Sequence, residues 1–253
     1  MARFSEKYKK ARSEKNSVMC IGLDPVHEKL EGKDILDFCL DIIESTSDYV
    51  AAFKPNSQFI LFSLNLEQLK ELNEEIHQTG CISILDHKLS DIGSSNESAF
   101  YWIKRADFDA LTFSPFAGNI EEATEKAHKN NLGLFILTLM SNPESRWIQK
   151  ETKFEGKSLY QKISEEVKSS GADGLVIGAT DHVTEEDIRK TRDLAGDDKI
   201  FLCPGIGAQG GDAEKILKNA GENILINVGR AIIFDEKPEE KAKEFRDLIN
   251  RFR

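Results

Sequence analysis

The amino-acid sequence predicts a (β/α)₈ barrel, and three observations support this fold class. Short apolar runs alternate with longer segments of helical periodicity, and eight such cycles fit into the 253 residues. Most apolar runs are nearly continuous, as expected for parallel strands buried on both faces. No linker or low-complexity tract divides the chain, so we expect residues 1–253 to form one domain. An open, doubly wound sheet is the alternative, because periodicity does not show whether a sheet closes.

The predicted elements follow one another in a regular order. The strands are expected at residues 18–23, 49–54, 81–86, 110–114, 132–139, 174–178, 200–205 and 223–229. Segments 66–80, 159–171 and 184–196 are predicted to be helices, because their apolar residues recur on one stripe. Residues 4–16 are predicted to form a helix that closes the bottom of the barrel.

One long segment does not fit either pattern. Residues 141–158, after the fifth strand, are expected to be irregular, and loops of this length are often functional. We expect the two tryptophans, Trp102 and Trp147, to anchor the core or loops rather than to stack on a ligand.

Composition narrows the possible partners and the compartment. The chain carries 34 Lys and Arg against 44 Asp and Glu, a formal charge of −10, which does not favour binding to nucleic acid. No apolar run reaches the roughly 20 residues of a membrane span, and residues 1–16 lack the apolar core of a secretory signal. We therefore expect a cytoplasmic protein that binds neither nucleic acid nor membranes. The four cysteines lack metal-binding spacing and are expected to be reduced and buried.

Polar residues gather where the predicted strands end. In a barrel of this kind the carboxyl ends of the strands carry function. The residues at these ends include Asp24, Lys54, Asp86, Ser141 and Arg230. A single charged residue at a strand end has no special meaning, because solvated turns often carry charge. Several of them at the same face predict a polar pocket at the mouth of the barrel.

The third strand ends in the densest charge cluster. Asp86 and Lys88 are two residues apart and share one face if the strand continues through them, whereas His87 should point away. Asp91 follows within a few residues, so the three charges can converge. An ammonium between two carboxylates stays protonated. Such a group is both a fixed positive charge and a proton donor, which suits a reaction that forms a carbanion.

Two glycine-rich segments predict a phosphate site. Residues 204–211 and 227–231 follow the seventh and eighth strands. Barrels often bind phosphate there through backbone N–H groups. Arg230 would add a bidentate contact.

These residues resemble a known family. The pattern Asp86-x-Lys88-x-x-Asp91, together with "GLDP" at 22–25, "FKPN" at 53–56 and "PGIGAQGGD" at 204–212, is similar to that of the orotidine 5′-phosphate decarboxylases, in their second, largely bacterial subgroup. The resemblance implies a TIM-barrel carboxy-lyase that converts orotidine 5′-phosphate into UMP and CO₂ in pyrimidine biosynthesis. It also implies a cytoplasmic homodimer with shared active sites and no metal or organic cofactor.

The resemblance further implies a role for each matching residue. Lys88 would stabilise the C6 carbanion and then protonate it. Asp86 would hold Lys88 and face the departing carboxylate, while Lys54 would complete the charge network. Asp91 would enter the partner subunit's site, with Ser95 near it. The substrate-binding residues would be Asp24 and Ser95 on the ribose side, Ser141 on the pyrimidine, Gln209 between base and phosphate, and Gly229 and Arg230 on the phosphate.

Two departures from the family pattern and two alternatives remain open. Leu89 and Ser90 stand where Arg-Gly is common, and Gly229 stands where serine usually precedes the arginine. Neither change removes a charge. One alternative is a sister group of barrels that stabilises an enediolate with magnesium, although Lys54 should repel that metal. The other is a binding barrel that keeps the pocket without turnover.

Overall fold

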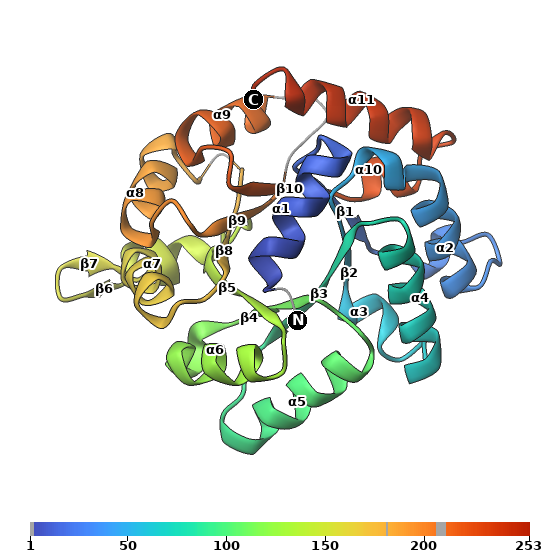
Figure 1. Cartoon of the computed structure of the whole chain (residues 1–253). Coiled ribbons are helices and arrows are strands. Elements are labelled where there is room, and N and C mark those ends of the chain that lie inside the picture. Colours follow the sequence, from blue (N-terminus) through green and yellow to red (C-terminus); the bar gives the residue numbers. More distant parts are fainter. Residues whose placement is uncertain (1–2, 181, 206–210) are drawn as a thin grey trace.

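The computed structural model describes residues 3–180, 182–205 and 211–253 and closes eight parallel strands into a barrel ringed by helices (Figure 1). The strands are β1 Met19–Leu23, β2 Ala52–Pro55, β3 Ile82–Leu89, β4 Ala110–Phe113, β5 Gly133–Leu139, β8 Gly174–Ile177, β9 Ile200–Pro204 and β10 Ile224–Val228. The barrel closes where Met19 of β1 lies opposite Ile226 of β10. The predicted strands and the predicted barrel are confirmed, and the open sheet is wrong.

The described residues form eleven α-helices, most of which cover the outside of the barrel. They are α1 Phe4–Lys15, α2 Ile35–Thr46, α3 Ser57–Ile60, α4 Leu66–Gln78, α5 Gly93–Arg105, α6 Ile120–Lys129, α7 Leu159–Ser170, α8 Glu185–Ala195, α9 Gly211–Ala220, α10 Arg230–Ile233 and α11 Pro238–Asn250. The helices predicted at 66–80, 159–171 and 184–196 are therefore confirmed. At the start of α8, Thr184 and Asp187 cap each other, which satisfies backbone N–H groups that the helix leaves free. Among the described residues, no helix is both long and apolar enough to cross a membrane.

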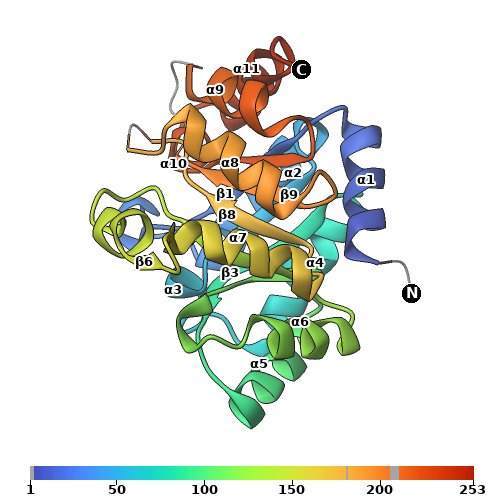
Figure 2. The same ribbon diagram turned by 90° about the vertical axis from the view of Figure 1, so that its left-hand side faces the viewer.

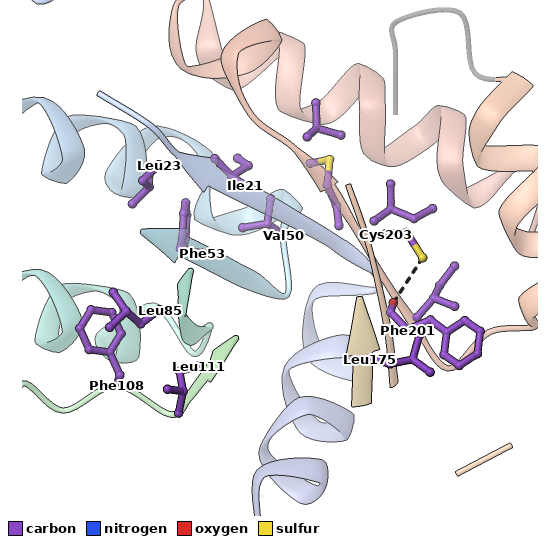
Figure 3. Packing of buried hydrophobic residues seen from close by; sticks show 14 of the residues in the cluster. Ile21, Leu23, Val50, Phe53, Leu85, Phe108, Leu111, Leu175, Phe201 and Cys203 are labelled. Atoms are coloured by element: carbon purple, nitrogen blue, oxygen red, sulfur yellow. Dashed lines mark hydrogen bonds between the residues drawn. The ribbon is translucent and has the colours of Figure 1, made fainter. Parts of the chain in front are cut away.

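Alternation along the strands divides the core into two layers. Outward-facing residues such as Phe53, Leu85 and Leu111 pack under the helices (Figure 3). Inward-facing residues such as Ala52 and Ile84 fill the barrel. All four cysteines are buried free thiols, as expected. Because side chains two apart share a face, the inward rows that fill the barrel continue toward its mouth.

Helix α1 closes the amino-terminal end of the barrel, as predicted (Figure 2). The ring of Phe4 packs edge-on against Phe135 of β5, with ring centroids 5.4 Å apart. The hydroxyl of Tyr8 donates a hydrogen bond to the carbonyl of Ile224 at the start of β10. A Cβ atom added at Gly133 would come 2.5 Å from the Phe4 ring, so this contact requires glycine. The opposite end of the barrel is thereby left as its open mouth.

The segment 141–158 is more ordered than the sequence predicts. It contains a π-helical turn, Trp147–Glu151, and a hairpin of β6 Lys153–Phe154 and β7 Lys157–Ser158. Lys150 fixes it to α8 through an ion pair with Asp187 (2.6 Å) and a hydrogen bond to the carbonyl of His182 (2.9 Å). The expectation of an irregular loop is wrong in this part, because these long-range contacts order it.

A buried carboxylate connects β3, α4 and α1 at the amino-terminal end of the barrel. Asp109 precedes β4, and its side chain is only 2% exposed. It accepts hydrogen bonds from the backbone N–H of Ser83 (3.0 Å), from Nε2 of His77 (2.9 Å) and from Nζ of Lys7 (2.5 Å). Burial opposes ionisation, but the bonds from His77 and Lys7 outweigh it and hold the pKa of Asp109 below its ordinary value.

We expect Asp109→Asn to lower the free energy of unfolding at pH 7 by about 2–3 kcal/mol, because Lys7 and His77 lose their anionic partner. A carboxyl whose pKa is lowered on folding stabilises the fold above its unfolded pKa, and this contribution disappears as the pH falls through the folded pKa. The difference between variant and wild type should therefore shrink below about pH 4. Urea unfolding of both proteins at a series of pH values measures this difference in the free energy of unfolding.

Asp41→Asn is the matched control. Asp41 pairs with Lys33 (2.6 Å) on the exposed surface, where an ion pair contributes little. A destabilisation by Asp109→Asn that is no larger than that of Asp41→Asn would contradict the role of the buried carboxylate.

Candidate active site

The candidate site lies where the inward-facing rows reach the mouth of the barrel. Lys54 follows Ala52 on the inner face of β2, Asp86 follows Ile84 on β3, and Thr112 follows Ala110 on β4. Lys54, Asp86, Lys88 and Thr112 line a cavity of about 160 Å³. The opposite wall is largely apolar and consists of Leu137, Met140, Val176, Leu202 and Pro204, with Ser141 beside them. Charged groups thus face an apolar wall, and the low dielectric strengthens their electrostatic effect.

One carboxylate joins two ammonium groups in this cavity. Oδ2 of Asp86 lies 2.5 Å from Nζ of Lys54, and Oδ1 lies 2.6 Å from Nζ of Lys88. The side chains of Lys54, Asp86 and Lys88 are 6%, 13% and 41% exposed. Lys88 is therefore the member of the cluster that is most open to a ligand and to solvent.

The ion pairs keep the cluster charged despite its burial. Burial opposes ionisation of Asp86, but Lys54 and Lys88 outweigh it and hold the pKa of this carboxyl far below its ordinary value. Burial also disfavours the ammonium of Lys54, yet Asp86 outweighs it and raises the pKa of Lys54. Asp24 contributes to this rise, so its carboxylate is part of the same electrostatic environment.

Asp91 does not join the cluster within one chain. It is exposed, and its Oδ1 accepts a hydrogen bond from the backbone N–H of Ile92 (2.8 Å). Asp86, Lys88 and Asp91 therefore do not converge within one chain, and the expected place of Asp91 in a partner subunit's site stays a prediction. The structure instead shows one carboxylate between two ammonium groups, because the chain turns outward after Leu89. Ser95, in the first turn of α5, is exposed as well.

Asp24 lies beside the predicted phosphate segment. Its Oδ1 is buried and has no hydrogen-bond partner among the described residues. A Cβ atom added at Gly229 would lie 4.0 Å from Oδ2 of Asp24, an ordinary van der Waals distance, so Gly229 lies close to this carboxylate. Arg230 follows at the exposed start of α10. Asp24 follows the end of β1, and Gly229 and Arg230 follow the end of β10, which is the neighbouring strand.

Of the two remaining predicted site residues, the structure describes Ser141 but not Gln209. Ser141 lines the cavity, and its carbonyl accepts a hydrogen bond from the hydroxyl of Thr180 (2.6 Å). A Cβ atom added at Gly178 would come 2.6 Å from Cα of Ser141, so glycine lets these two loops pack closely. Gln209 lies outside the described residues, as does most of the glycine-rich segment 204–211.

Sequence reasoning missed two polar residues at the mouth. The hydroxyl of Thr112 donates to Oδ1 of Asp86 (3.1 Å) and accepts from the backbone N–H of Lys88 (2.9 Å). Asn227, on β10, lies 3.3 Å from the position that a Cβ atom of Gly22 would take, and its buried Oδ1 has no partner among the described residues. Both interrupt apolar runs at an inward position, and that was the signal that could have identified them.

Apolar side chains are exposed on the elements that carry Asp91 and Ser95. They are Ile92, Tyr101, Trp102 and, after β4, Phe116. Trp102 is 54% exposed and Trp147 is 64% exposed. A place in the core is therefore wrong for both tryptophans, and their expected role as loop anchors stays a prediction. Among the described residues, no group of three or more His, Cys, Asp or Glu side chains is arranged to hold a metal ion.

Comparisons with a family model, with related sequences and with solved structures all find orotidine 5′-phosphate decarboxylases. A family model described as "Orotidine 5'-phosphate decarboxylase / HUMPS family" matches residues 17–245. The orotidine 5′-phosphate decarboxylase of Cupriavidus metallidurans is 35% identical over 274 aligned positions, which cover 99% of this chain and 98% of the relative. Leishmania donovani OMP decarboxylase superposes with a TM-score of 0.85 at 26% identity and covers 99% of this chain and 98% of its own. The Methanocaldococcus jannaschii orotidine 5′-monophosphate decarboxylase, solved with the inhibitor BMP, has a TM-score of 0.74 at 27% identity over 92% of this chain and 98% of its own.

We expect Asp86→Asn to lower the free energy of unfolding at pH 7 by about 3–5 kcal/mol, because it leaves the buried ammonium of Lys54 without its counter-ion. Asp41→Asn again serves as the control, and it should unfold close to wild type because Asp41 pairs with Lys33 on the exposed surface. Urea unfolding of both variants measures the difference. Equal stability of the two variants would show that the cluster is not buried as described.

Proposed function

This chain belongs to the orotidine 5′-phosphate decarboxylase / HUMPS family, and we propose that Lys54, Asp86 and Lys88 form its reaction centre. The family match and the named bacterial relatives identify the chain as a carboxy-lyase of pyrimidine biosynthesis that converts orotidine 5′-phosphate into UMP and CO₂. The observation that supports the reaction centre is the carboxylate held between two ammonium groups beside an apolar wall. We also propose that the whole chain acts as one catalytic domain.

The proposed mechanism stabilises the negative charge that develops at C6 of the pyrimidine. When the C6–carboxylate bond breaks, CO₂ leaves and the electron pair stays on C6. The ammonium of Lys88 stabilises this carbanion and then gives it a proton, so that a C–H bond forms and an N–H bond breaks. The neutral amine of Lys88 regains its proton from water, to which its side chain is accessible (41% exposed).

Asp86 and Lys54 are proposed to destabilise the bound substrate and to orient the ammonium of Lys88. Asp86 directs the ammonium of Lys88, and its negative charge repels the substrate carboxylate until CO₂ departs. Lys54 balances Asp86, so that this carboxylate stays ionised in a largely buried position. The three groups therefore favour the transition state over the bound substrate.

The other residues are proposed to hold the nucleotide. The unpaired, buried Oδ1 of Asp24 suits a ribose hydroxyl as hydrogen-bond donor. Ser141 would bind the pyrimidine and Gln209 would connect base and phosphate. Gly229 and Arg230 would bind the phosphate. Contacts to this remote phosphate supply binding energy that can be used at the reacting carbon.

We propose a homodimer in which each subunit completes its partner's site. Asp91 and Ser95 are exposed in the single chain, and the exposed side chains of Ile92, Tyr101 and Trp102 lie on or next to α5, which also carries Ser95. Such side chains are typical of the centre of a protein interface. Asp91 of the partner subunit would add the second carboxylate near Lys88, and the partner's Ser95 would lie near the ribose.

The alternatives are less well supported. A magnesium site would need an acidic group where the buried ammonium of Lys54 stands, 2.5 Å from Asp86. A binding barrel without turnover would have no need to hold two ammonium groups on one desolvated carboxylate.

We expect the purified chain to decarboxylate orotidine 5′-phosphate in the presence of a chelator, as followed by ultraviolet absorbance. Lys88→Ala should abolish this activity, whereas the neighbouring His87→Ala should retain it within about tenfold, because His87 does not line the cavity. Binding of UMP, measured by calorimetry, should survive in both. No turnover by the wild type would contradict the proposed function, and an active Lys88→Ala variant would contradict the assigned mechanism.

Shared sites can be tested by complementation. Lys88→Ala and Asp91→Asn should each be inactive alone, but their mixed dimer contains one site in which both residues are intact. Co-expression of the two variants should therefore recover about a quarter of wild-type activity if the subunits pair at random. If each site is built from one chain, co-expression will recover nothing.

A further inference from the structure

A single buried hydroxyl connects the two catalytic charges of β3. Thr112 is 1% exposed and lies on β4, beside the end of β3. Its Oγ1 accepts a hydrogen bond from the backbone N–H of Lys88 (2.9 Å) and donates one to Oδ1 of Asp86 (3.1 Å). That carboxylate oxygen is the one that binds Nζ of Lys88 (2.6 Å). We propose that Thr112 is a positioning residue that sets the geometry of Lys88 and Asp86 for the decarboxylation, and this inference rests on the proposed function.

The backbone at Lys88 requires such support. Its φ angle of +53° lies in the left-handed region, which side chains other than glycine rarely adopt. The paired residues are Leu85 with Leu111 and Leu89 with Phe113, so β3 contains two more residues than β4 over this interval. This bulge takes the N–H of Lys88 out of the regular ladder. Because no strand carbonyl among the described residues accepts from this N–H in the regular ladder, the hydroxyl of Thr112 accepts its hydrogen bond instead.

The same hydroxyl also restricts the carboxylate. Oδ2 of Asp86 is held by Lys54, and Oδ1 is shared by Lys88 and Thr112. Both oxygens therefore have fixed partners, and the carboxylate cannot rotate without breaking one of these bonds. Because Thr112 is buried, water does not readily replace its hydroxyl. The direction of the Lys88 ammonium thus depends on a residue that does not bear a charge.

This arrangement predicts an effect on the chemical step rather than on binding. The groups proposed to hold ribose and phosphate lie at β1 and β10, across the mouth from Thr112. A small misalignment of a reacting group has a large effect on rate. Loss of the hydroxyl should therefore lower kcat and leave KM and UMP affinity nearly unchanged.

The test compares Thr112→Val, which keeps the shape and removes the hydroxyl, with Thr112→Ser, which keeps the hydroxyl. We expect kcat of Thr112→Val to fall roughly 10- to 100-fold, with KM and the Kd for UMP within about threefold of wild type. Thr112→Ser should recover kcat to within about threefold of wild type. Equal kcat for Thr112→Val and wild type, or equal losses in both variants, would overturn the inference.

A second measurement does not depend on activity. Amide hydrogen exchange at Lys88, followed by NMR, should be faster in Thr112→Val than in wild type, and Thr112→Ser should restore protection. Unchanged protection in Thr112→Val would overturn the inference even if the enzyme assay failed. An inactive wild type would contradict only the proposed function. Thermal unfolding of each variant shows whether the fold is retained.

Discussion

The site depends on the ion pair between Asp86 and Lys54 at the mouth of the barrel. Each group alone would be costly to bury, because a desolvated charge without a partner is strongly disfavoured. Together, at 2.5 Å, they keep each other ionised. Lys88 can then bind the other oxygen of Asp86 while staying open to the cavity. A fixed, charged environment is obtained without any change of protonation during the approach of a substrate.

The barrel makes this arrangement possible through strand alternation. The small and apolar residues below the mouth, Ala52 on β2 and Ile84 on β3, are buried and pack in the interior of the barrel. Lys54 and Asp86 follow them in the same inward rows, so the core itself forms the floor of the site. The helices contribute by fixing the strands from outside through residues such as Phe53 and Leu85 (Figure 3). Inward positions of these short strands therefore provide both the interior packing and the charged cluster, while outward positions pack against the helices.

The sequence predicts the barrel and most of the site, because strand ends and inward positions follow from local patterns. The cluster at Asp86 and Lys88 was identifiable because charge follows an apolar run. The left-handed Lys88 was not, since the bulge depends on how β3 pairs with β4. A lone threonine in an apolar strand resembles an ordinary β-former, so Thr112 was missed. The order in 141–158 depends on the contact of Lys150 with a distant helix, which local patterns do not contain.

The charge balance of a single chain is also informative. Among the residues that line the cavity, Lys54 and Lys88 carry two positive charges against the one negative charge of Asp86, while Asp24 lies outside this lining. A cavity with this excess attracts an anion, yet its carboxylate repels any anionic group placed directly beside it. A substrate whose negative charge moves from a carboxylate near Asp86 to an atom near Lys88 as the reaction proceeds satisfies both conditions. A second carboxylate supplied by a partner subunit would neutralise the excess in the resting site, and it would fix Lys88 from the side that the single chain leaves exposed. The outward turn after Leu89 that removes Asp91 from its own site therefore agrees with the dimer proposed above, because it makes this carboxylate available to a second chain.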